Sequence, residues 1–166
     1  MEDTAPPYQH ADRNAVDRLR LWLQMLKAVR HVEGVLRERL RSGYDTTLPR
    51  FDVLAALHAR PVGMKMSELS QHLIVSNGNV TGVVDRLVAD GLAERHSLAS
   101  DRRAIVVQIT DKGRALMDDM AAAHLTWINE MFGAISEADA ARGMSIMLDI
   151  RQGQPDPAEA QVPGTD

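Results

Sequence analysis

The chain has 166 residues and a formal net charge of −4, and 45% of its residues are hydrophobic and 25% charged, which is the composition of an ordinary globular protein. It contains no cysteine, and this excludes disulfides, thiolate metal sites and thiol-based redox sensing. No apolar run approaches the roughly 18 residues of a membrane span and the acidic N-terminus is unlike a signal peptide, so we expect a cytoplasmic protein with no membrane partner.

The charge is distributed unevenly along the chain. Residues 13–41 carry eight basic and three acidic side chains, residues 62–110 carry five of each, and residues 111–166 carry four basic and ten acidic. Because the acid is concentrated in the C-terminal third, the negative net charge does not exclude a nucleic-acid partner. The neutral middle region predicts only a modest salt dependence of any DNA binding.

The N-terminal region predicts one long helix. Residues 1–12 are polar and read as a disordered tail. Apolar residues then recur with helical spacing over 13–41, with Gly34 expected to loosen the helix midway and Ser42-Gly43 to end it. A helix of this length is unusual in a globular protein unless a partner covers it.

A group of short elements follows. Pro49 predicts the start of a second helix, residues 60–63 break it, and Met64-Lys65 predict a short strand. A third helix is expected to open near Ser67, with apolar residues one turn apart. The second and third helices precede the most informative stretch of the chain.

That stretch predicts a helix from Ser76 to Ala89, with Ser76 as its N-cap and Gly91 ending it in a left-handed conformation. Its apolar residues fall on one face: Val80, Val83, Val84, Leu87 and Val88. Its other face is polar or small: Asn77, Asn79, Thr81, Gly82, Asp85 and Arg86. Asn and Arg suit the edges of bases, so the pair of helices favours a helix-turn-helix that enters a major groove.

Residues 92–97 and 104–109 predict a β-hairpin with a charged tip at 98–103. A charged tip is usually a solvated loop. Arg102 and Arg103, however, directly follow a helix-turn-helix, and arginine on a slim projection suits the narrow minor groove. The hairpin therefore favours a wing.

Two helices are expected after the hairpin. Thr110 predicts an N-cap, and the helical period continues to about Ile135. Ser136 and Asp139 resemble a capping box that starts a last helix. Residues 152–166 are rich in proline and acid and predict a disordered tail.

Four motifs together resemble the MarR family of bacterial transcription regulators: Asp85-Arg86-Leu87, Gly91-Leu92, Asp101-Arg102-Arg103 and Ile109-Thr110-Asp111-Lys112-Gly113-Arg114. The resemblance covers roughly residues 13–151. It implies a mainly α fold with a small β-wing, in which 49–110 form a winged helix-turn-helix and 13–41 and 111–151 form long dimerisation helices of one domain. It also implies an obligate homodimer on double-stranded operator DNA.

The resemblance assigns major-groove reading to the helix from Ser76 to Ala89 and minor-groove contact to Arg103, with Asp101 orienting it. Gly82 departs from the family, where a larger and often basic residue is common. The helix therefore has fewer side chains for direct contact with bases. The predicted DNA-binding residues are Ser67, Ser76, Asn77, Asn79, Thr81, Arg86, Arg95, Arg102 and Arg103.

Members of the family commonly release DNA when a small ligand, often an aromatic acid, binds where the dimer helices meet the winged domain. Residues 47–52 and 76–82 resemble a subgroup that controls aromatic-acid breakdown, some of whose members respond to hydroxycinnamoyl-CoA thioesters. The alternative interpretations without a ligand are core packing for the aromatic residues and a solvated helix end for the basic run at 37–41. The candidate effector residues are Trp22, Met25, Arg30, Arg37, Arg39, Arg41, Phe51, His58, Met117, His124 and Trp127.

Other function classes fit the residues less well. No phosphate loop, nucleophile elbow or zincin motif is present, so we expect no enzyme and no cofactor. Four histidines, His58, His72, His96 and His124, lack the spacing of metal ligands. A winged helix used only for protein contacts remains an alternative, as does an activator in place of a repressor.

Overall fold

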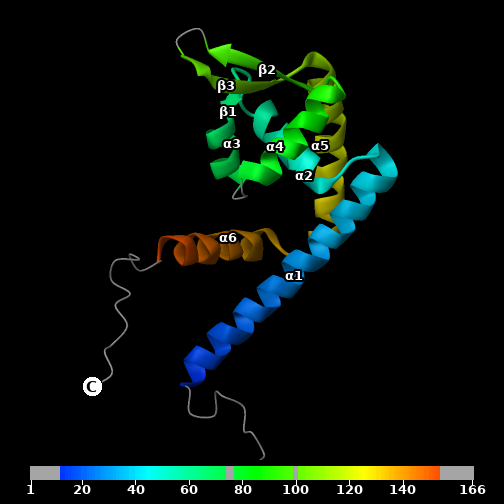
Figure 1. Ribbon diagram of the computed structural model, residues 1–166. Coiled ribbons are helices and arrows are strands. Elements are labelled where there is room, and N and C mark those ends of the chain that lie inside the picture. Colours follow the sequence, from blue (N-terminus) through cyan, green and yellow to red (C-terminus); the bar gives the residue numbers. More distant parts are fainter. Residues whose placement is uncertain (1–11, 74–76, 99–100, 154–166) are drawn as a thin grey trace, which may run out of the picture. The chain divides into compact units, whose positions relative to one another are not determined.

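The computed structural model describes residues 12–73, 77–98 and 101–153, and of residues 77–79, 98 and 101–104 it describes only the backbone. These residues form six helices and three short strands (Figure 1). The elements are α1 (Arg13–Tyr44), α2 (Leu48–His58), β1 (Met64–Lys65), α3 (Met66–Leu73), α4 (Asn77–Ala89), β2 (Ala93–Leu98), β3 (Asp101–Ile109), α5 (Asp111–Phe132) and α6 (Glu137–Gln152).

The chain forms two compact units, one ending at Trp127 and one beginning at Ile128. The first unit holds α1 to α4, the sheet and most of α5, and the second holds the end of α5 and α6. Within the described ranges, none of the helices is both long and apolar enough to cross a membrane.

A winged helix-turn-helix forms the centre of the first unit, as the sequence predicted. The apolar stripe of α4 is buried: Val80, Val84 and Leu87 are at most 1% exposed. They pack in one cluster with residues of α2, α3 and the sheet, including Leu54, Leu57, Leu69 and Val107. This apolar face fixes α4 with its opposite face outward.

The three strands form an antiparallel sheet in the order β1-β3-β2 (Figure 1). The short strand predicted at Met64-Lys65 is confirmed, because Met64 pairs with Val107. The predicted six-residue hairpin tip is wrong. Leu98 pairs with Asp101 after an irregularity at Ser97/Leu98, so Arg102 and Arg103 belong to β3, and only residues 99 and 100 lie between the strands.

The helix ends correct several predicted boundaries. α1 runs through Gly34 without a break and past Ser42-Gly43 to Tyr44, where Asp45 adopts a left-handed conformation with φ of +46°. An aspartate tolerates this conformation better than most residues, so no glycine is needed to end the helix. α2 begins one residue earlier than predicted, and α5 ends at Phe132, before Ile135.

The tail boundaries shift slightly too. Asp12, assigned to the N-terminal tail, caps α1 by accepting the backbone N–H of Asn14 at 3.4 Å, and Gln152 is the last residue of α6. The rest of the two predicted tails, 1–11 and 154–166, falls outside the described residues.

The two predicted helix caps of the C-terminal half are confirmed. Thr110 Oγ1 accepts the N–H of Gly113 at 3.1 Å at the start of α5. Ser136 Oγ accepts the N–H of Asp139 at 3.2 Å at the start of α6. Each bond satisfies one of the backbone donors that a helix leaves free at its N-terminus.

Apolar residues in the long helices are covered far less than those of α4. In α1 only Leu36 and Leu40 are buried, while Leu21, Trp22, Leu23 and Val29 remain exposed. In the second unit no residue of α6 is buried. These helices therefore present apolar side chains that the described part of the chain does not cover.

Candidate nucleic-acid interface

The outer face of α4 is polar and open. Thr81, Gly82, Asp85 and Arg86 are exposed, on the side opposite the buried valines and Leu87. Asn77 and Asn79 belong to the same helix, but their side chains lie outside the described residues, as does Ser76 altogether. Among the described side chains, the face therefore carries the Thr81 hydroxyl, the Arg86 guanidinium and the Asp85 carboxylate, which is paired with Arg95, beside the bare backbone of Gly82.

The C-terminal end of α4 is fixed by a Schellman motif. Gly91 has φ of +70°, its N–H reaches the carbonyl of Val88 at 3.0 Å, and the N–H of Leu92 reaches the carbonyl of Leu87 at 2.8 Å. Leu87 and Leu92 are both buried, which supplies the apolar contact typical of this motif. The predicted role of Gly91 is confirmed.

The wing is tied to α4 by an ion pair. Arg95 of β2 donates from Nη1 to Asp85 Oδ1 of α4 at 2.5 Å, and about a third of the Arg95 side chain is exposed. Arg95 was predicted to contact DNA. In this structure its guanidinium holds the base of the hairpin against the middle of α4, and its DNA contact stays a prediction.

The other predicted DNA contacts are only partly placed. Ser67 is exposed in the first turn of α3. The backbone of Asp101, Arg102 and Arg103 forms the start of β3, and their side chains, with the predicted pairing of Asp101 to Arg103, lie outside the described residues. The structure therefore brings α4 and the hairpin together without testing the individual contacts.

Several predicted effector residues meet where α2 packs against α5. The rings of Phe51 and His124 lie 4.9 Å apart, and burial lowers the pKa of His124. His58 Nε2 lies 2.8 Å from Asp118 Oδ1, and Met117 is buried in the core cluster. These contacts fit the core-packing alternative as well as an effector site.

Trp127 lies at a second junction, between α1 and α5. Its ring is 6.2 Å from that of Tyr44 in an edge-to-face arrangement, and the guanidinium carbon of Arg39 is 5.8 Å from its centroid. The hydroxyl of Tyr44 also donates to the carbonyl of Asp119 at 3.2 Å. An aromatic face and a cation are thus adjacent.

Two of the predicted cations are already paired within α1. Arg37 bonds Glu33 at 2.5 Å and Arg41 bonds Glu38 at 2.7 Å. The hydrogen bond and charge of Arg41 lower the pKa of Glu38. The basic run at 37–41 therefore offers fewer cations to a ligand than its sequence predicts.

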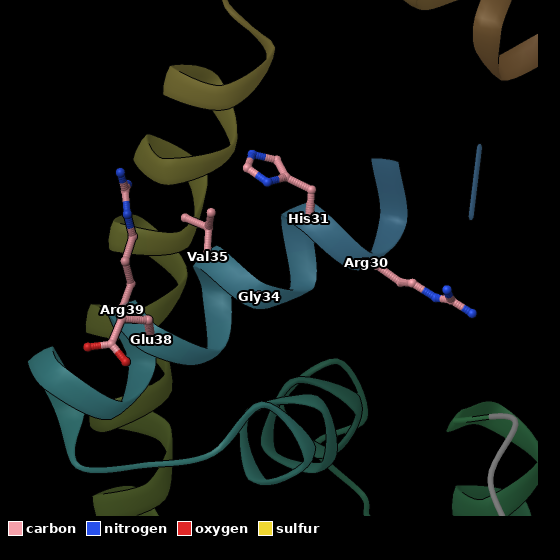
Figure 2. Close-up of a pocket in the computed structure, with 6 residues that line it drawn as sticks. All are labelled: Arg30, His31, Gly34, Val35, Glu38 and Arg39. Atoms are coloured by element: carbon pink, nitrogen blue, oxygen red, sulfur yellow. The ribbon is translucent and has the colours of Figure 1, made fainter. Parts of the chain in front are cut away.

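A groove of about 520 Å³ runs along α1. Figure 2 shows His31, Val35 and Arg39 along one ridge of the helix, and Gly34 opens the groove because it has no side chain. Arg30 and Arg39 of this groove are among the predicted effector residues, whereas the predicted Trp22 and Met25 do not line it. His31, Gly34, Val35 and Glu38 also line the groove and were not among the predicted residues, since their spacing in the sequence fits an ordinary helix surface.

Sequence reasoning also missed the contacts that hold the end of α4 to other helices. Arg50 of α2 donates to the carboxylate of Asp90 at 2.5 Å, and Lys112 of α5 donates to the carbonyl of Asp90 at 2.8 Å. Such long-range pairs leave no local signal. The described part of the chain contains no cluster of three or more His, Cys, Asp or Glu residues that could hold a metal ion.

Comparisons with known proteins agree with this architecture. The sequence model of the MarR family matches residues 46–105. The transcriptional regulator PecS of Dickeya dadantii is 29% identical over 61% of this chain, and the alignment covers 63% of PecS. The crystal structure of a MarR family regulator from Silicibacter pomeroyi is 30% identical, covers 85% of this chain and 97% of that one, and superposes with a TM-score of 0.73.

Two further structures share the fold and hold ligands. Sco3205 of Streptomyces coelicolor, solved in complex with DNA, is 20% identical with a TM-score of 0.77 and covers 87% of this chain and 92% of its own. CouR of Rhodococcus jostii, solved with p-coumaroyl-CoA, is 20% identical with a TM-score of 0.72. The match covers 82% of this chain and 94% of the CouR chain. The winged helix-turn-helix fold and these matches together show that the chain belongs to the MarR family and is a transcription regulator of that type.

Proposed function

We propose that the chain acts as a homodimeric repressor, binding a pseudo-palindromic operator in double-stranded DNA until a small aromatic acid or its CoA thioester releases it. The observation that carries the DNA part is the orientation of α4. Its apolar stripe is buried and its polar face, with Thr81 and Arg86, is exposed beside a hairpin. A helix in this orientation suits insertion into a major groove.

Dimerisation is supported by the uncovered apolar surface. In the second unit a groove of about 750 Å³ runs between the end of α5 and α6, lined largely by apolar side chains such as Phe132, Ile135, Met144 and Met147. α1 exposes Leu21, Trp22 and Leu23. A second copy could cover such surfaces, and the proposed dimer needs its two α4 helices roughly 34–36 Å apart to match one turn of DNA.

The effector part of the proposal is supported by the junctions of α1, α2 and α5. The groove on α1 carries Arg30 and Arg39, which suit an anionic group. Trp127 offers an aromatic ring beside Arg39, one of the groove residues. A ligand that favours a dimer with wrongly spaced recognition helices by about 2–3 kcal/mol would weaken operator binding some thirty- to hundredfold.

The DNA proposal is tested by selecting duplexes from a random pool with the full chain and measuring the affinity of the selected sequence by fluorescence anisotropy. We expect a two-fold symmetric site. Arg86→Ala and Arg103→Ala should each lose about 1–3 kcal/mol of binding free energy. Arg20→Ala, which alters an exposed pair with Asp17 in α1, serves as the control. Selection of no preferred sequence would favour a protein-interaction module instead.

The regulatory parts need separate measurements. Sedimentation at micromolar concentration should show dimers, and monomers would contradict the proposal.

Calorimetry with p-coumarate and p-coumaroyl-CoA should show binding of one of them, and binding of neither would remove the aromatic effector. Transcription in vitro from a promoter that carries the selected site should fall when the protein is added, whereas a rise would indicate an activator.

A further inference from the structure

Cations from two different helices meet at the C-terminal end of α4. Arg50, in the first turn of α2, donates from Nη2 to Asp90 Oδ2 at 2.5 Å. Lys112, in the first turn of α5, donates from Nζ to the backbone carbonyl of Asp90 at 2.8 Å. Asp90 follows the last residue of α4 and precedes Gly91 of the Schellman motif. One residue at the end of the recognition helix is therefore bound to both α2 and α5.

An acidic residue at this position does not serve α4 itself. The C-terminus of a helix carries a partial negative charge, so a carboxylate there is unfavourable, and a neutral side chain would be preferred. Asp90 nevertheless stands at this end. Its carboxylate gains from the contact with Arg50, a residue 40 positions away in the sequence, and not from the helix that it ends.

The burial of Arg50 also costs hydration free energy. Its side chain is only 18% exposed, and its Nε is buried without a hydrogen-bond partner among the described residues. A guanidinium that gives up water for one contact is a poor source of stability. It does fix the two groups it joins in one relative position, because leaving either charge unpaired in a partly buried site is unfavourable.

The neighbours of Arg50 show why its position matters. Phe51 packs against His124 of α5, and the half-buried Asp52 is close enough to Glu33 of α1 for that charge to raise its pKa, after the larger effect of burial. Three consecutive residues of α2 thus face α4, α5 and α1. Arg50 is the member of this group that reaches the recognition helix.

We propose that Arg50 is a positioning residue for DNA reading: through Asp90 it fixes the C-terminal end of α4 to α2, without itself touching DNA. This role rests on the proposed function. Loss of the contact lets α4 adopt a range of tilts, which weakens binding to a matched site that needs every contact at once. Binding to an unmatched duplex depends on phosphate contacts and tolerates such tilts.

The test compares affinity for the selected duplex with affinity for a scrambled duplex of equal length. Arg50→Met and Asp90→Asn should each weaken binding to the selected duplex about three- to thirtyfold, with a smaller change on the scrambled one, and the double variant should be no worse than either single variant. Arg50→Lys should restore most of the affinity, because only one nitrogen of Arg50 contacts Asp90. Arg20→Met is the control, since its partner Asp17 lies in the same helix.

Asp90→Asn separates positioning from simple stability. Asparagine removes a carboxylate from the negative end of α4, which is favourable, but it also leaves the Arg50 charge unpaired, which is unfavourable. The two effects oppose each other, so the thermal midpoint should change little while discrimination between the duplexes falls. A wild-type chain that prefers no duplex would overturn the proposed function and this role together. A wild type that discriminates, with Arg50→Met and Asp90→Asn variants that discriminate equally well or whose losses add, would overturn the role of Arg50 alone.

Discussion

The recognition helix α4 and the last helix α6 differ in what covers them. Both have apolar residues at helical spacing, but Val84 and Leu87 of α4 are fully buried, whereas Met144 and Leu148 of α6 are more than half exposed. α4 finds its cover in α2, α3 and the sheet of the same subunit. Periodicity therefore predicts an apolar face, while the elements that cover this face depend on residues far away in the sequence or in another chain.

The largest expected effect comes from truncating the same residue type in the two helices. Leu87→Ala should lower the free energy of unfolding by about 2–5 kcal/mol, because it leaves a cavity in a packed core. Leu148→Ala should leave the unfolding of the winged domain unchanged and weaken only the association of the proposed dimer. Urea denaturation and sedimentation measure the two effects. Equal losses of unfolding free energy in both variants would show that α6 is covered as fully as α4.

A second contrast uses two glycines. A Cβ added at Gly113 would lie 2.0 Å from the carbonyl oxygen of Leu92, whereas one added at Gly34 would meet no atom within 4 Å. Gly113→Ala should therefore destabilise the domain by about 1–3 kcal/mol through overpacking. Gly34→Ala should stabilise α1 by up to about 1 kcal/mol. Thermal denaturation of both variants checks the pair, and a stabilised Gly113→Ala variant would show that α5 can move away from β2.

Helix capping should matter less than core packing. Ser136→Ala removes the hydroxyl that accepts the N–H of Asp139 and should cost α6 about 1 kcal/mol. Ser145→Ala, inside the same exposed helix, should be neutral or slightly stabilising because alanine is the better helix former. Hydrogen exchange of α6 amides reports both changes. Slower exchange in Ser136→Ala would contradict the capping role.

The smallest expected effect is the pH dependence of stability at His124. Burial lowers the pKa of His124 in the folded chain. As the pH falls below about 6.5, His124 is therefore protonated in the unfolded chain before it is protonated in the folded chain. Stability should therefore fall as the pH is lowered from 6.5 toward the folded pKa. Unfolding measured at several pH values should show a shallower slope for His124→Gln than for the wild type, while His72→Gln, an exposed control, should not change it.

Local chemistry explains which parts of the fold could be predicted from the sequence. The caps at Thr110 and Ser136 and the left-handed Gly91 act within a few residues, and so does the alternation that buries Val107 and Ile109. The extent of β3 was not predicted, because the pairing of Leu98 with Asp101 depends on a partner strand and an irregularity.

The features of the candidate site also divide into those set by local sequence and those set by long-range contacts. The exposed face of α4 follows from its period and was predicted. The pairs Arg95–Asp85 and Arg50–Asp90 join residues 10 and 40 positions apart, and only the folded chain brings them together. The pairing of Arg37 with Glu33 was available from the i, i+4 spacing, although the sequence reading assigned that arginine to a ligand.

Gly82 lies in the middle of the outward face of α4, and a Cβ built there meets no atom within 4 Å. An introduced side chain at this position would therefore start in open space among the described residues, and in the proposed complex it would face the duplex. Residue 82 is thus the natural place to rewrite which sequences the protein prefers, by saturation mutagenesis, with little penalty to its folding.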